Sequence, residues 1–525
     1  MKGVVKMEKN NGASVFSRNI FLGEHSAESA CDYSLPDYKS DLRRVLYSKA
    51  EVIPAAAFID SGEVCYSGVV SYSIVYLNGE NELEGLEITS DYDGAVKSES
   101  EGAECVSVDT RVANYSLRLV GPRRLQARAS LSSEITLGES VCREIGGDAF
   151  KNSDTLQLSQ LQFKVGRVRS FLSEERELAA KIGDFEGAIA DEVRVIHSSA
   201  TARVDDASLT VGGVEIRGSA VVNSLVRIRD EAPVKLSAVI PFEETVGADG
   251  ISDESEIFAE GRISSVKVEV NPVEFGCEIT ADVIAEISVI SHENTEVSAI
   301  DDAYLTNGYA DCEYESFAYD ECLPSIFETV RAEENVERAA LGLSGARDIV
   351  LADALPKLQA EIDADGTVRV SGEIKFSGIA SEVGDGGELS FISFKHSVPF
   401  EKKLGALSCG EGVTRCECRV GTLSSAADID KGQICFSYEG KVSVFAREKK
   451  CVRMLASMKT GEIDGGERRP SRVTVYYPDR SDSLFGIAKK FRTTVRNIAV
   501  DNALTESVVS SGAVNGINAK KLIIR

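Results

Sequence analysis

The chain has 525 residues and a net charge of −26, from 84 acidic and 58 basic residues. Such an acidic excess argues against nucleic acid as a partner, because the phosphate backbone would repel most of the chain. The length suffices for three or four domains, each able to bury its own core. No stretch approaches the roughly 18 apolar residues of a membrane-spanning helix, and residues 1–19 lack a signal-peptide core. We therefore expect a soluble, cytoplasmic protein without transmembrane insertion.

The N-terminal part of the chain is polar up to about residue 28, and we expect it to be loosely ordered. After Pro36 the pattern predicts a short helix that carries Leu42 and Leu46 on one side. Its cap can be Asp37 or Ser40. Comparable segments at 185–196 and 338–351 precede the later repeats described next. We expect each of these segments to be a short helix at one end of a domain.

A glycine-marked strand recurs three times, with paired glycines at 62 and 68, at 212 and 218, and at 366 and 372. Apolar residues fall on every second position of each copy, which is typical of a strand with one buried face. Gly68, Gly218 and Gly372 occupy the buried register, where glycine indicates a bulge or the close approach of another backbone. The copies begin 150 and then 154 residues apart, and this spacing predicts three domains.

A second alternating block follows each copy, at residues 125–137, 277–289 and 434–446. Between the two blocks the later copies share Pro-Phe-Glu, at 241–243 and 399–401, where the first copy has only Tyr92. Five or six strands per copy, joined by Gly, Asp and Asn turns, predict a β-sandwich or open barrel for each.

Beyond the repeats, residues 459–472 are rich in Gly, Pro and charged residues and read as a linker. Residues 473–525 then follow a β-α-α-β pattern, with strands at 473–477 and 522–524. Asp482 caps the first helix, which buries Leu484 and Ile487, and Thr494 begins the second. This module carries eight basic and four acidic residues, a net charge of +4 that leaves −30 for the rest. A basic tail on an acidic body suggests docking on an acidic partner, although charge variation in a small solvated domain is the simpler explanation.

No catalytic or metal-binding set emerges from the sequence. The four histidines, His25, His197, His292 and His396, fit no triad or metal spacing, and we expect them to be surface or strand residues. Cys409, Cys416 and Cys418 come closest to a ligand cluster but lack a fourth ligand. Twelve cysteines are scattered without a disulfide framework, which favours a reducing compartment. We therefore predict no cofactor, no metal and no enzymatic activity.

The C-terminal run from Ser481 to Phe491, with Thr494-Val495, Asn502 and Leu522-Ile523-Ile524, resembles a LysM domain. Ser481, Ser483 and Asn518-Ala519 replace the glycine, the threonine and the Pro-Gly turn of that family. LysM modules bind N-acetylglucosamine chains through the loops after the first strand and after the second helix. The resemblance therefore implies a contact face, listed here as Asp482, Ser483, Leu484, Phe485, Asn502, Ala503 and Leu504. Leu484 and Phe485 can instead be core of this small domain, and for Leu484 we favour core.

The segment from Leu35 to Leu42, Leu-Pro-Asp-Tyr-Lys-Ser-Asp-Leu, followed by the glycine-marked hairpin, looks like the start of a SPOCS domain. The resemblance predicts a flexible N-terminus at 1–28, SPOCS-like β-domains at 29–150, 151–305 and 306–458, the linker, and a LysM domain at 473–525. SPOCS repeats ending in one LysM domain are similar to the spore coat morphogenetic proteins of clostridia. That family implies a mother-cell protein at the forespore surface that binds the coat ATPase SpoIVA.

Three functions remain open at this point. The first is a spore coat assembly scaffold whose C-terminal module docks on a protein partner, expected to be a SpoIVA-like ATPase. The second is a peptidoglycan-binding protein of the cortex or cell wall. The third is an enzyme, which requires a pocket that gathers acids or histidines from separate strands.

Overall fold

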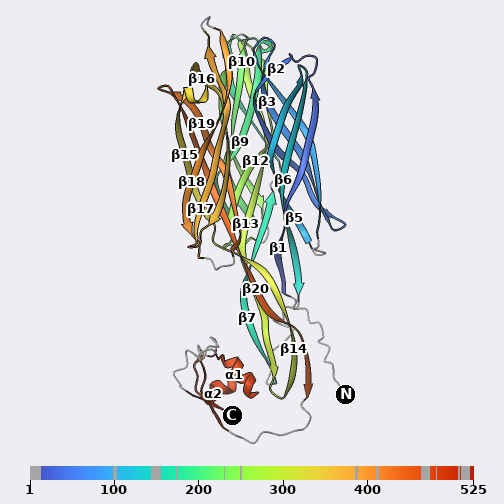
Figure 1. Cartoon of the computed structure of the whole chain (residues 1–525). Coiled ribbons are helices and arrows are strands. Elements are labelled where there is room, and N and C mark those ends of the chain that lie inside the picture. The colour runs from blue at the N-terminus through green and yellow to red at the C-terminus, as the bar shows by residue number, and fades with distance from the viewer. Residues whose placement is uncertain are drawn as a thin grey trace.

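The computed structural model describes residues 14–98, 103–143, 155–172, 175–229, 231–248, 251–384, 388–408, 413–462, 473–479, 482–506, 509 and 521–525. These residues form a mostly β chain of several small antiparallel sheets, with two short helices near the C-terminus (Figure 1). The prediction of a mostly β chain is confirmed.

One three-stranded antiparallel sheet occurs three times, and the glycine-marked strand lies at its centre each time. We call these the inner sheets. The first consists of β2 (Leu42–Asp60), β3 (Glu63–Asn78) and β4 (Leu83–Lys97). The second consists of β9 (Val193–Thr210), β10 (Gly213–Ile228) and β11 (Val234–Gly247). The third consists of β16 (Ala346–Ile362), β17 (Thr367–Val383) and β18 (Leu389–Ala406).

A second sheet accompanies each inner sheet and is built on the second alternating block. The first is β1 (Ser14–Ser34), β6 (Arg124–Arg143) and β5 (Ala103–Gly121). The next contains β12 (Glu256–Val273), β13 (Gly276–Leu305), β7 (Leu156–Leu172) and β8 (Arg176–Glu186). The last contains β14 (Gly308–Cys322), β20 (Gln433–Glu462), β15 (Ile326–Glu337) and β19 (Val413–Asp430). In these two, a pair of shorter strands takes the place of β1 along the long strand.

Each inner sheet shares an apolar core with its accompanying sheet. In the first repeat Val64, Tyr72 and Ile74 from β3 pack with Leu131 and Ile135 from β6, and all are at most 1% exposed. Equivalent cores join β10 to β13 and β17 to β20. The period-two alternation in the sequence therefore marks the buried faces, as predicted.

The second glycine of each pair allows close contact between strands. A Cβ on Gly68 would lie 2.5 Å from the Ile53 carbonyl oxygen, and one on Gly218 would lie 2.3 Å from that of Arg203. The aromatic residue of the neighbouring strand lies opposite: Tyr92 pairs with Gly68, and Phe242 pairs with Gly218. The aromatic ring thus covers the backbone that glycine leaves bare, and the predicted close approach is confirmed.

The helix predicted around Ser40–Leu46 is wrong, because strand β2 begins at Leu42. Register shifts between Leu42 and Arg44 and between Val45 and Tyr47 interrupt the alternation, so Leu42 is buried in the core of the first repeat whereas Leu46 is buried in a different cluster. The other two predicted helices shrink to the 3₁₀ turns η1 (Ala190–Glu192) and η2 (Arg338–Leu341). The expectation of a loose N-terminus also fails in part, because β1 already covers residues 14–28.

The strands β13 and β20 are each 30 residues long and continue beyond the repeats. Together with β7 and β14 they form a narrow extension, whose core contains Phe163, Val297, Phe317 and Met454 (Figure 1). Since β20 runs to Glu462, the strand reaches into the predicted linker, and residues 463–472 lie outside the described residues.

At the end of this extension lies the C-terminal module, with strands β21 (Thr474–Tyr476) and β22 (Leu522–Ile524) and helices α1 (Leu484–Phe491) and α2 (Val495–Asp501). The two strands pair antiparallel, so the described part follows the predicted β-α-α-β order. Leu484, Ile487, Ile498 and Leu522 form its core.

Candidate functional site

The three inner sheets meet around one apolar cluster. Leu46, Ile196 and Val350, which occupy equivalent positions in the three repeats, pack there with Val75, Leu225 and Ile379. Here the outward face of each inner sheet, which elsewhere carries polar residues, is apolar. The repeats therefore bury both faces of their inner sheets at this end and associate around a common centre.

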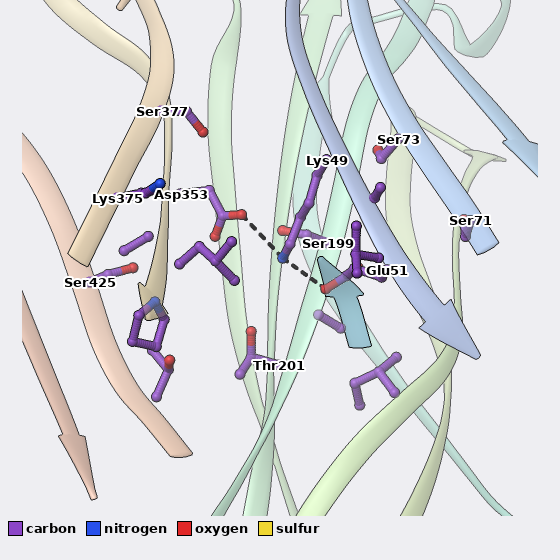
Figure 2. Close-up of a pocket in the computed structure, with 18 of the residues that line it drawn as sticks. Lys49, Glu51, Ser71, Ser73, Ser199, Thr201, Asp353, Lys375, Ser377 and Ser425 are labelled. Carbon is purple, nitrogen blue, oxygen red and sulfur yellow. Dashed lines mark ion pairs between the residues drawn. The ribbon is translucent and has the colours of Figure 1, made fainter. Parts of the chain in front are cut away.

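Next to this apolar cluster the inner sheets, together with β5, β12 and β19, line a central cavity of about 1760 Å³ (Figure 2). All three repeats line it, and hydroxyl groups dominate the labelled wall, which includes Ser71, Ser73, Ser199, Thr201, Ser377 and Ser425. Between Ser198 and Ala202, β9 contributes only small side chains to the wall. The structure thus creates a polar chamber where three repeats converge.

Lys49 of the first repeat crosses this cavity to Asp353 of the third. Its Nζ lies 3.1 Å from the Asp353 carboxylate and 2.9 Å from Glu51 (Figure 2). Burial favours the neutral amine, but the two carboxylates outweigh it and raise the pKa of Lys49. Lys49 therefore stays charged, and it links two repeats electrostatically.

The second repeat joins the same centre through His197. The ring of Tyr47 contacts the His197 ring edge-on at 5.4 Å between centroids, and the Tyr47 hydroxyl donates to Asp353 at 3.1 Å. Nδ1 of His197 lies 3.1 Å from the Ser73 hydroxyl. Burial, together with the charge of Lys49, lowers the pKa of His197 to about 4 although Asp353 opposes the shift. His197 is therefore neutral near pH 7.

A second charged contact joins the repeats further along the cavity wall. Arg419 on β19 pairs with Glu417 at 2.7 Å, with Glu260 on β12 at 3.2 Å and with Asp109 on β5 at 4.0 Å. These partners come from the third, second and first repeats respectively. The three repeats are thus connected around the cavity by the apolar cluster, by the ion pairs of Lys49 and by those of Arg419.

The cavity gathers acids and two histidines, His197 and His396, from separate strands, which is the pattern that an enzyme requires. Its central groups nevertheless have partners within the chain: Lys49 with two carboxylates, Tyr47 with Asp353, and His197 with Ser73. The arrangement is suited to fixing the repeats relative to one another. Sequence analysis missed it, although positions 49, 199 and 353 are related by the 150- and 154-residue spacing of the repeats.

The remaining residues considered for chemistry lie in strands or outside the description. His292 on β13 stacks on Phe445 at 4.1 Å, and burial lowers its pKa to about 3. Burial raises the pKa values of Cys416 and Cys418 on β19 to about 11, which makes them poor thiolate ligands. Cys409 lies outside the described residues, and within them no group of three or more His, Cys, Asp or Glu could hold a metal ion.

Polar members of the predicted contact face have structural partners in the C-terminal module. Asp482 accepts hydrogen bonds from the Asp479 backbone N–H and the Tyr476 hydroxyl, which lower its pKa. The cap predicted at Asp482 is wrong, because Ser483 caps α1 by accepting from the Gly486 N–H at 2.9 Å. Asn502 holds β22 through two hydrogen bonds with Ile523, each 2.7 Å.

The other four predicted contact residues divide between core and surface. Leu484 is 1% exposed, so it belongs to the core of the module. Phe485 and Leu504 are half-buried against that core, and Ala503 is exposed with a φ of 49°. Ligand binding by this face stays a prediction.

The module contacts the end of the extension through α1. Tyr304 of β13 is 5% exposed, donates to the Thr493 carbonyl oxygen at 2.7 Å and packs edge-on against Phe485 at 5.1 Å. Beside it, Lys489 pairs with Asp302 at 2.6 Å. One end of the predicted contact face is therefore occupied by the chain itself.

Comparison with protein-family models, with curated proteins and with solved structures finds no match to this chain. Among the described residues, no helix has the length and apolar character needed to span a membrane.

Proposed function

We propose that this chain is a non-enzymatic scaffold for spore coat assembly, resembling SipL and related proteins that combine SPOCS repeats with a LysM domain. On this proposal each pair of sheets is a SPOCS-like β-sandwich and the C-terminal module is the LysM domain. The scaffold acts on the mother-cell side of the forespore, and the module docks on a coat ATPase similar to SpoIVA.

One observation carries the proposal: the chain holds a basic module at the end of a long extension. Tyr304 and Asp302 fix α1 to the end of β13. Within the repeats, ion pairs and an apolar cluster bind three bodies into one. The three joined repeats are acidic and present a small basic module, an arrangement that suits a role in assembly.

Deletion of residues 473–525 tests the docking role in sporulating cells that express the chain as a fluorescent fusion. We expect the deleted chain to lose its place at the forespore surface while its body stays folded. The substitutions Val473→Asp and Val500→Asp, on side chains that are 58% and 74% exposed, probe the module without removing it. Unchanged localisation in the deleted chain would refute the docking role.

A different measurement distinguishes peptidoglycan binding from docking on a protein. The full chain is sedimented with purified peptidoglycan, with and without a soluble N-acetylglucosamine oligomer as competitor. Retention that the oligomer abolishes would favour glycan binding over protein docking. We expect the chain to remain in solution, because Phe485 is packed against Tyr304 and Asn502 is bonded to Ile523.

A further inference from the structure

The C-terminal module has an outward sheet face that nothing in the described chain covers. The strands β21 and β22 alternate, so Leu522 and Ile524 point into the core while Lys521, Ile523 and Arg525 point outward. On β21 the outward residues are Val473, Val475 and Tyr477, which are 58%, 48% and 69% exposed.

The strand register arranges these six residues as three neighbouring pairs. Val475 lies opposite Ile523, and continuation of the register places Val473 beside Arg525 and Tyr477 beside Lys521. The face therefore combines four apolar side chains with two cations and contains no acidic residue. We call it the module face.

A groove of about 830 Å³ with the opposite charge lies in the second repeat, between the β12–β13 turn and the segment after β8. Its apolar residues Ile189, Val273 and Phe275 are 55%, 44% and 78% exposed. Glu186 and Glu274 border it, and neither carboxylate forms an ion pair within the described part of the chain. A hydrogen bond of 2.9 Å from the Gly187 N–H to the Phe275 carbonyl oxygen fixes the two segments together.

The equivalent turns of the other repeats lack this character. In the first repeat the turn contains Pro122 and Arg123, and Arg123 is paired with Asp41 at 2.7 Å. In the third repeat it contains Lys431 and Gly432. Only one of the three related turns thus presents an aromatic residue between carboxylates, which marks the groove as a specific feature of the second repeat.

The module face and the groove lie at opposite ends of one strand. Gly276, the first residue of β13, lines the groove, while Tyr304 near its last residue contacts the module. Thirty residues of strand span about 100 Å. The module of one chain therefore cannot reach its own groove, and the complementary surface is available only on another molecule.

We propose that copies of this chain associate head to tail, with the module face of one copy in the groove of the next. The apolar residues meet, and Lys521 and Arg525 approach Glu186 and Glu274. Such a contact joins two different surfaces, so it repeats along the strand direction and builds an open filament unless the rotation closes it. This self-association does not depend on the identity of the coat partner.

The contact is small, since six side chains bury less than the roughly 800 Å² per partner of a typical stable interface. We therefore expect association only at high protein concentration and low salt. In sedimentation velocity, the full chain should show a mean mass that rises with concentration. Val475→Asp and Phe275→Asp should each leave a monomer, whereas Phe58→Asp, at a side chain 53% exposed on β2, should associate normally.

Mixing the two variants gives the sharpest test. The Val475→Asp chain keeps an intact groove and the Phe275→Asp chain keeps an intact module face, so their mixture should form a one-to-one dimer and nothing larger. Glu274→Lys and Lys521→Glu should each weaken association, and the double variant should regain part of it. Circular dichroism checks that every variant is folded.

Three results would overturn the proposal: a monomer at all concentrations, association that neither variant weakens, and a mixture that stays monomeric. Binding of the monomer to vesicles of anionic lipid through Val475 and Lys521 would assign the module face to a membrane surface instead.

Discussion

At the scale of single residues, His197 couples the junction of the three repeats to pH. The pKa of its buried ring is about 4, against about 6.5 for an unfolded histidine. Between these two values the unfolded chain binds more protons than the folded chain. Stability therefore falls as the pH drops through this window. Above it the ring is neutral in both the folded and the unfolded chain, so the stability no longer depends on its protonation.

The substitution His197→Gln should remove this pH dependence. Lowering the pH from 6.5 to 4 should cost the wild type about 3 kcal/mol more than the variant, at about 1.4 kcal/mol per pK unit. Urea unfolding at several pH values measures the difference. Ser73→Ala, which removes only the hydrogen bond partner, should lower stability similarly at each pH. Equal pH profiles for wild type and His197→Gln would contradict this role.

Lys49 is the second residue whose role can be measured. In Lys49→Met, the Tyr47 hydroxyl is the partner that Asp353 keeps among the described residues of the cavity. We expect the free energy of unfolding to fall by about 2 kcal/mol, the usual range for a hydrogen bond to a charged group. Lys267→Met on β12, which breaks an exposed pair with Glu269, should change little.

A double-variant cycle tests whether the Lys49 effect belongs to the ion pair. Combining Lys49→Met with Asp353→Asn should cost less than the sum of the two single substitutions, because each removes the same contact. Additive costs would show that the two side chains act independently.

At the scale of elements, the sequence predicts the strands well because burial there follows the backbone period. The alternation around Tyr72 and Ile74 in β3 is an example. It fails at the start of β2, where two bulges shift the period, so that Leu42 lies in the core of the first repeat and Leu46 in the cluster between the inner sheets. A bulge depends on the neighbouring strand, so a single strand read alone does not reveal it.

The paired glycines give an element-scale prediction. In Gly218→Ala the new Cβ would lie 2.3 Å from the Arg203 carbonyl oxygen and 2.6 Å from the Phe242 ring. We expect a loss of about 2 kcal/mol, as for other overpacked sites. Gly421→Ala in β19, where no atom lies within 4 Å of the new Cβ, is the matched control. If thermal unfolding shows the same shift for both, the close approach does not determine the glycine.

At the scale of the whole molecule, convergence of the repeats could not be predicted from one repeat's pattern. The outward face of a strand is polar where it contacts water and apolar where it contacts another sheet, and in this chain the apolar part is only a few residues long. That signal exists: alternation stops at Ile74–Leu77 in β3, where four successive apolar residues are buried. The polar cavity residues Lys49 and Asp353 carry no such signal, because exposed strand faces bear the same residue types.

The attachment of the C-terminal module is also a property of the whole chain, and Tyr304 tests it. Tyr304→Ala removes a buried ring and its hydrogen bond to Thr493, which should cost roughly 3 kcal/mol of docking free energy. Since the module then separates from β13 more often, backbone amides of α1 in contact with it should exchange with solvent roughly 100-fold faster. The repeats should keep their own exchange rates, because their cores lie elsewhere along β13 and β20.

Tyr309→Ala provides the control, since this ring is 53% exposed at the start of the neighbouring strand β14. It should leave exchange in α1 unchanged. Disruption of the ion pair by Asp302→Asn should give an intermediate increase, because Lys489 loses a partner while the Tyr304 ring stays in place. If Tyr304→Ala leaves α1 as protected as in the wild type, the module is held by contacts other than the end of β13, and the extension does not fix its position.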